Sequence, residues 1–141
     1  MIDASAVMDT NVFVAAGFNT RSASARIIDA IRRRQIRMIW NKATRREIDL
    51  IVNRIPPLRK LDFSDLFVPV DEYLGPVDPA RFSDIPDPDD WKFAALAHAA
   101  GVPLVSNDSH LLDQREHHDL IVLTPGEYWG RHVGSEPYDS S

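Results

Sequence analysis

Short apolar runs alternate with segments of helical periodicity along most of the chain. We interpret four of the runs as strands: Ala4–Met8, Arg37–Trp40, Pro103–Ser106 and Leu120–Leu123. They are brief and mostly lack polar alternation, as is typical of strands that are covered on both faces. Because strands that alternate with helices form parallel sheets, we expect an α/β fold, a three-layer sandwich in which helices flank a mostly parallel central sheet.

The segments between these runs carry the marks of helices. Four are predicted to be helical: Val12–Phe18, Ser22–Arg34, Lys42–Ile55 and Asp89–Ala100. The second and third each show one apolar stripe, and Ser22 or Ser24 can cap the second. Gly101 follows the fourth, where a C-terminal cap belongs.

Prolines divide the stretch between the third and fourth predicted helices. Pro56-Pro57 ends the third helix, because proline interrupts the helical hydrogen bonding. Pro76–Asp89 is rich in proline and is interpreted as a loop. Between them, Phe67–Val70 and Tyr73–Val77 are predicted to be extended, and one of the two is a candidate additional strand.

The end of the chain differs from the rest. Thr124 can cap a final helical turn, and Pro125 suits its first position. After Trp129 the sequence becomes polar and rich in Gly and Ser. Since 141 residues correspond to one ordinary domain, we expect a single domain over residues 1–130 and a flexible tail over 131–141.

Charge is distributed unevenly along the chain. The net charge is −5, which by itself argues against a nucleic-acid partner. Residues 21–60, however, contain twelve bases and only three acids, whereas residues 61–141 contain four bases and sixteen acids. The strongly cationic stretch leaves room for a polyanionic partner in spite of the total charge.

Several classes of protein are excluded by composition. The chain has no cysteine, which rules out disulfides, zinc–thiolate sites and a thiol nucleophile. No apolar run approaches the roughly 20 residues of a membrane span. Residues 1–9 lack the basic flank and apolar centre of a signal peptide, so we expect a cytoplasmic protein that does not associate with membranes.

Acidic residues stand where predicted strands end and helices begin. Asp9 follows the first strand and Asp108 follows a later one, while Glu47 and Asp90 lie near the starts of two helices. Ligands of open parallel sheets bind beyond the carboxyl ends of the strands, so the fold can direct all four acids to one crevice. Clustered carboxylates repel one another unless cations neutralise them, and oxygen donors favour Mg²⁺ or Mn²⁺.

The blocks that carry these acids resemble the PIN-domain nucleases. Met8-Asp9-Thr10-Asn11-Val12 is similar to the opening signature of that family, and Thr44–Ile48 to the segment with its second acid. Asp87–Ala97, followed by Leu104–Leu112, resembles the block with the third and fourth acids. The similarity spans about residues 6–128, and it is closest to the group described as toxin components of toxin–antitoxin systems (VapC-like).

The resemblance implies a metal-dependent endoribonuclease that hydrolyses RNA phosphodiester bonds. It implies a catalytic quartet, of which the first, third and fourth members would hold Mg²⁺ or Mn²⁺: Asp9, Glu47, Asp90 and Asp108. It also implies polar supports for that site: Thr10, Asn11, Ser106 and Asn107. Asp87 is the first alternative to Asp90 as the third acid, and Asp89 can instead cap the helix.

Partners follow from the same reasoning. Five cations near the crevice are expected to grip the RNA backbone: Arg21, Lys42, Arg45, Arg46 and Lys92. The resemblance further implies a cognate antitoxin protein and a homodimer.

Two other functions compete with this hypothesis. The first is a non-catalytic PIN-fold module that binds RNA or protein through an incomplete metal site. The second is a phosphotransfer domain of the receiver type, which needs a paired acid at the first strand and a lysine after the last. Asp3 is poorly placed for that pair and no lysine follows Lys92, so we rank this reading last.

Overall fold

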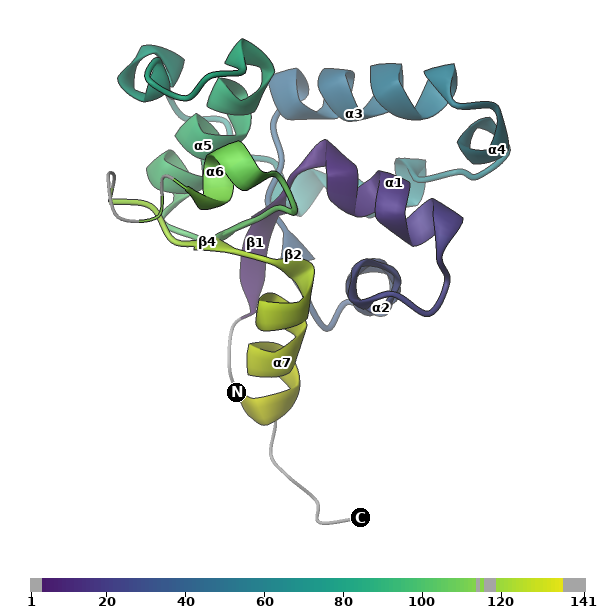
Figure 1. The fold of residues 1–141 in the computed structure, drawn as a ribbon. Helices are drawn as coiled ribbons and strands as arrows, with labels where there is room; N and C mark the ends of the chain where they lie inside the picture. The colour runs from purple at the N-terminus through teal and green to yellow at the C-terminus, as the bar shows by residue number, and fades with distance from the viewer. Residues whose placement is uncertain (1–3, 114, 116–118, 136–141) are drawn as a thin grey trace.

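A parallel four-stranded sheet forms the centre of the molecule (Figure 1). The computed structural model describes residues 4–113, 115 and 119–135. The strands are β1 (Ser5–Met8), β2 (Arg37–Met38), β3 (Leu104–Val105) and β4 (Val122–Leu123), in the order β2-β1-β3-β4. All three pairings are parallel. Strands, order and flanking helices together confirm the predicted α/β class.

The order of the strands creates a reversal beside β1. The chain leaves β1 through α1 (Thr10–Phe18) and α2 (Ala23–Arg32) and reaches β2 on one side. It returns through α3 (Lys42–Arg54) and α5 (Pro88–Ala100) to β3 on the other side of β1. Because such crossovers are right-handed, α5 lies on the face opposite α1 and α2, as Figure 1 shows. The carboxyl ends of β1 and β3 therefore diverge at a switch point, where α/β proteins bind their ligands.

Local capping fixes the helices close to where the sequence predicts them. The Ser22 hydroxyl accepts a hydrogen bond from the N–H of Ala25 at the start of α2. Gly101 ends α5 with a φ of 70°, a left-handed conformation that favours glycine. The N-cap of α5 is Asp87, whose carboxylate accepts from the N–H of Asp89, so the expectation that Asp89 caps this helix is wrong.

The proline-containing stretch holds short helices rather than a strand. They are α4 (Pro56–Arg59), η1 (Ser64–Leu66), η2 (Pro69–Asp71) and η3 (Pro79–Phe82). Three of the four begin with proline, whose fixed φ suits the first helical position. The expected strand is reduced, within the described residues, to one parallel bridge between Trp40 and Glu72. The predicted extended segments are thus corrected, because Pro69 turns the chain where a strand would run.

The C-terminal helix is longer than predicted. A short α6 (Ser109–Leu112) precedes β4, and α7 spans Pro125–Ser135. Thr124 caps α7 as predicted: its hydroxyl accepts a hydrogen bond from the Glu127 N–H, and the Thr124 N–H donates to the Glu127 carboxylate. Tyr128 and His132, one turn apart, are buried on the face of the helix that packs on α2. The helix thus extends over residues 131–135, which the sequence analysis assigned to the tail, and residues 136–141 lie outside the described ones.

The hydrophobic core fills both sides of the sheet. Ala6, Val7 and Met8 of β1 are almost fully buried. Phe13 of α1 packs edge-on against Phe63 and parallel to Phe67. Across the described part of the chain, no helix combines the length and apolar character required to cross a bilayer.

Candidate functional site

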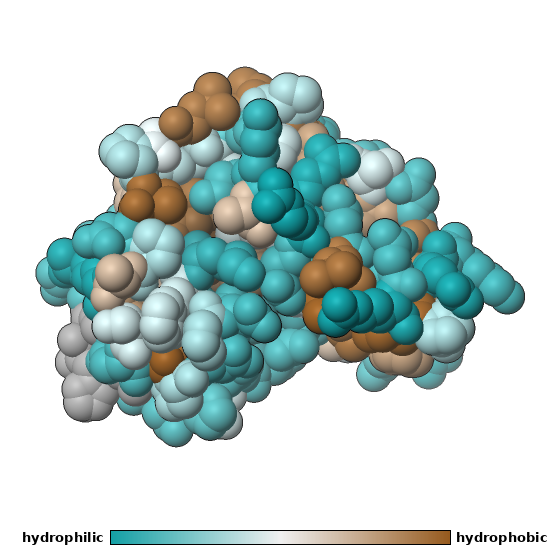
Figure 2. Space-filling model, turned by 90° about the horizontal axis from the view of Figure 1, so that it is seen from above, coloured by the Kyte–Doolittle hydropathy of each residue, from teal (hydrophilic) through white to brown (hydrophobic). Residues whose placement is uncertain are grey.

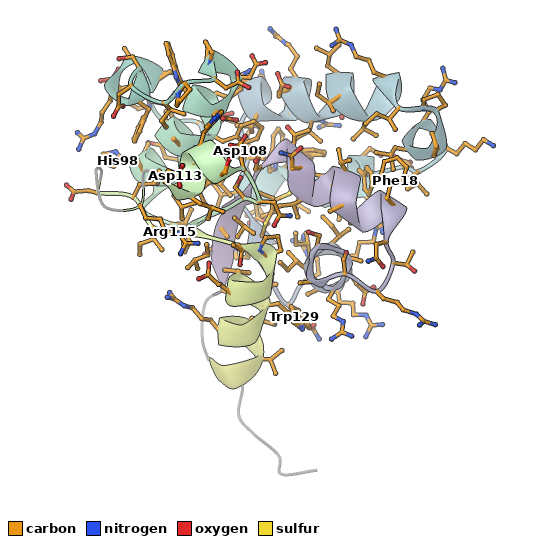
Figure 3. All side chains as sticks on the ribbon, in the orientation of Figure 1. Phe18, His98, Asp108, Asp113, Arg115 and Trp129 are labelled. Carbon is orange, nitrogen blue, oxygen red and sulfur yellow. The ribbon has the colours of Figure 1, made fainter. Side chains whose placement is uncertain are left out.

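An acidic pocket of about 190 Å³ lies at the switch point, between the ends of β1 and β3 and the helices α3 and α5. Six acids line it: Asp9, Glu47, Asp87, Asp89, Asp90 and Asp108. All four acids of the expected quartet are among them, although they come from positions far apart in the sequence. In Figure 3, Asp108 marks the start of α6, near the upper ends of β1 and α5. We call this cavity the acidic pocket.

Asp9 is held rigidly at the end of β1. Its side chain is 3% exposed, and its Oδ2 accepts a hydrogen bond from the Ser106 hydroxyl at 2.6 Å. Burial raises the pKa of Asp9 to about 6; the Ser106 hydrogen bond opposes this rise, and the charge of Asp108 adds to it. The loss of hydration on folding thus outweighs the hydrogen bonds that the Asp9 carboxylate receives from Ser106 and from the backbone of Thr10 and Asn11.

Asp90 is buried with one carboxylate oxygen that has no hydrogen-bond partner among the described residues. It is 6% exposed, and the unpartnered oxygen is Oδ2. Burial, followed by repulsion from Asp108, Asp9 and Asp87, raises the pKa of Asp90 to about 8. An unpaired buried carboxylate oxygen costs free energy that a positive ion can recover.

The alternatives to Asp90 occupy different places. Asp87 uses its carboxylate to cap α5, and the Asp89 side chain is 70% exposed. Both line the acidic pocket. Of the three neighbouring acids, Asp90 is the one that the structure buries.

Ser106 connects the two central strands at the pocket. Its hydroxyl donates to Asp9 and accepts from the N–H of Asp108 at 2.9 Å. Asp108 in turn caps α6, with its Oδ1 accepting from the N–H of His110 at 2.8 Å. One buried serine therefore sets the distance between the first and fourth acids of the expected quartet.

Glu47 has a partner that the sequence analysis did not predict. The Nζ atom of Lys92 lies 3.1 Å from Glu47 Oε1 and 3.8 Å from Asp89 Oδ1. The side chains of Glu47 and Lys92 are 13% and 26% exposed, so water screens this pair only weakly. The only hint in the sequence is the i,i+3 spacing of Asp89 and Lys92, because Glu47 is 45 residues away.

The predicted polar supports divide into two groups. Thr10, Asn11 and Ser106 lie at the site: Thr10 and Asn11 line the pocket, and Ser106 bonds Asp9. The Thr10 hydroxyl is buried and, among the described residues, has no hydrogen-bond partner. Asn107 is exposed and is not among the residues that line the pocket.

The five predicted RNA-binding cations are also in different situations. Arg21 follows the far end of α1, about 14 Å of helix away from the pocket. Arg45 stacks on Phe67 and Trp40 and pairs with Asp49, while Lys92 pairs with Glu47. Lys42 and Arg46, one turn apart on α3, are exposed and form no ion pair with any residue described. Figure 2 looks down on the molecule from this side and shows a largely hydrophilic face with separate hydrophobic patches.

The donor set suits a hard divalent cation. Every acid offers oxygen, two of the acids have raised pKa values, and one buried oxygen is unpaired. Within residues 4–113, 115 and 119–135, no group of three or more Asp, Glu or His side chains is already arranged to hold an ion. Binding would therefore require movements of the side chains that line the pocket.

Comparison with known proteins identifies a family for this chain. A family model described as PIN domain matches residues 5–110, a span that includes all four acids of the quartet. A search of curated proteins found no match.

Proposed function

Since the chain belongs to the PIN domain family, whose members are usually nucleases, we propose that it is a metal-dependent endoribonuclease. The observation that carries the proposal is Asp90, a buried acid with an unpaired oxygen beside Asp9 and Asp108. These three acids would hold Mg²⁺ or Mn²⁺, with Asp9 kept in place by Ser106. When bound, such an ion lowers the pKa of water and stabilises the charge on the leaving oxygen.

The remaining parts of the reaction fall to the chain's own side chains. Glu47 would orient the attacking water and accept its proton, because its carboxylate lines the pocket and Lys92 fixes its position. In-line attack on the phosphodiester would leave a 5′-phosphate and a 3′-hydroxyl. Lys42 and Arg46 are the cations best placed to bind the RNA backbone, since both are exposed on the helix that carries Glu47.

The decisive experiment is cleavage of several RNAs with Mn²⁺ or Mg²⁺, and again with EDTA. We expect cleavage only with the metal, and Asp9→Asn should abolish it while circular dichroism shows that the fold is kept. Asp113→Asn is the matched control, because it removes one acid outside the pocket. Full activity of Asp9→Asn, or equal cleavage in EDTA, would refute the assignment.

A second candidate is a PIN-fold module that binds RNA or protein without cleaving it. It is favoured by one finding, that no metal-ready group of side chains exists among the described residues. Titration with Mn²⁺ separates the two functions. A failure to bind Mn²⁺ at near-physiological concentrations, together with retained RNA binding, would favour the module.

The proposed biological role is that of a toxin in a toxin–antitoxin pair. Support comes from the resemblance of the acid-bearing blocks to toxin components, and the role implies a cognate antitoxin and a homodimer. Production of the chain in bacterial cells should arrest growth, and co-production of the protein from the adjacent gene should relieve the arrest. Normal growth with an active, soluble chain would refute the toxin role and leave the ribonuclease proposal intact.

A further inference from the structure

One lysine, Lys92, lies beside the acidic pocket and contacts only two of the six acids that line it. The ammonium group of Lys92 lies within hydrogen-bond distance of Glu47 and 3.8 Å from Asp89, which places both acids beside a positive charge. Asp9, Asp87, Asp90 and Asp108 have no Lys or Arg partner among the described residues, although His110 Nδ1 lies 3.8 Å from Asp108 Oδ1. The pocket therefore has one part beside an ammonium group and one part without a Lys or Arg partner.

The two parts are held by different elements. Glu47 comes from α3, and Asp89 and Lys92 come from one side of the first turns of α5. Asp9 and Asp108 come from the ends of β1 and β3, and Ser106 ties them together. Asp90 lies between them, with its unpaired Oδ2 buried. The charge deficit is thus greatest at the acids away from Lys92, and Asp9 and Asp90 are buried among them.

We propose that the acidic pocket binds a single divalent cation, at Asp9, Asp90 and Asp108, and that Lys92 takes the place of a second cation beside Glu47. A second ion at Glu47 would have to break the 3.1 Å contact and approach the ammonium group against like-charge repulsion. Lys92 is accordingly a positioning residue that keeps the Glu47 carboxylate available to water instead of metal. This inference rests on the proposed metal site and adds the number of ions and the reason for it.

The test is the stoichiometry of Mn²⁺ binding to the full chain, measured by calorimetry and by electron paramagnetic resonance of free Mn²⁺. We expect one ion for the unaltered protein and one for Lys92→Arg, which keeps the charge. Lys92→Gln should gain a second ion. The double variant Lys92→Gln/Glu47→Gln should return to one, because it removes the carboxylate that the second ion would need and leaves the local net charge unchanged.

Several results would overturn the inference. These are two ions on the unaltered protein, one ion on a folded Lys92→Gln, or loss of the single ion in the double variant. If Lys92→Gln does not fold, the unaltered protein and Lys92→Arg still test the number of ions, because two ions on either would refute the inference. One bound ion without RNA cleavage would refute the proposed function alone, whereas cleavage with two bound ions would refute this inference alone; no bound ion would refute both.

Discussion

Asp90→Asn is the substitution whose effect follows most directly from the structure. Burial and neighbouring acids raise the pKa of Asp90 to about 8 from an ordinary 3.8. At pH 7 the folded protein therefore keeps this carboxyl group protonated, whereas the unfolded chain ionises it. Since the folded state binds the proton more tightly, this group lowers stability as the pH rises from 3.8 to about 8.

The size of the effect can be estimated from the same shift. One pKa unit corresponds to about 1.4 kcal/mol, so retaining the proton at pH 7 costs about 4 kcal/mol. Asparagine is uncharged at every pH and avoids this cost, although its amide donors also need partners. We expect the metal-free variant to be more stable than the unaltered protein at pH 7, by up to about 4 kcal/mol, and to lose the advantage near pH 4.

The assay is urea unfolding in EDTA at pH 4, 5.5, 7 and 8.5, repeated in Mn²⁺ at the two higher values. Mn²⁺ should stabilise the unaltered protein, because the ion binds only the folded state. It should leave the stability of Asp90→Asn nearly unchanged, because an amide does not replace the Asp90 carboxylate as a ligand. Asp89→Asn is the matched control: it removes an exposed acid from the same helical turn and leaves Asp90 in place, so its stability should fall with pH as that of the unaltered protein does. If Asp90→Asn is no more stable than the unaltered protein at pH 7 in EDTA, the account of a strained acid at the pocket is wrong.

Two further predictions concern the support of the site and its substrate. Ser106→Ala removes the donor to Asp9 and should cost about 1–3 kcal/mol of stability. It should also raise the pKa of the Asp9 carboxyl further, which nuclear magnetic resonance titration would measure. An unchanged pKa of Asp9 would contradict this prediction. Arg46→Gln should weaken RNA binding and reduce the slope of log affinity against log salt by about 0.7. Arg21→Gln, at the far end of α1, should change neither the affinity nor the slope. If Arg46→Gln weakens binding no more than Arg21→Gln does, Arg46 does not contact the RNA backbone.

The acids of the pocket were predictable because their signals are local. Asp9 directly follows an apolar run, and a carboxylate at the end of a parallel strand is carried to the ligand-binding edge of the sheet. The start of α7 was predictable for the same reason, since Thr124 and Pro125 determine it within one turn. Each of these features depends on residues adjacent in the sequence.

Other features depend on packing between distant segments. The length of α7 follows from the burial of Tyr128 and His132 on the face toward α2, about 100 residues earlier in the chain. The pairing of Glu47 with Lys92 requires α3 and α5 to lie side by side, which no local pattern encodes. Each proline had two possible effects, ending a helix or starting one, and only the tertiary structure selects between them.

The hydroxyl of Ser106 also dictates when the site can exist during synthesis. It donates to Asp9, which lies 97 positions earlier in the chain, and Ser106 itself directly follows β3. Asp108 comes two residues after Ser106. A nascent chain that has reached only the end of α5 has neither β3 nor the fourth acid. Its β1 then has β2 on one side and no strand on the other. Such a chain, still attached to the ribosome and its messenger RNA, cannot assemble the pocket. If the protein cleaves RNA, the order of its strands delays that activity until most of the domain has emerged.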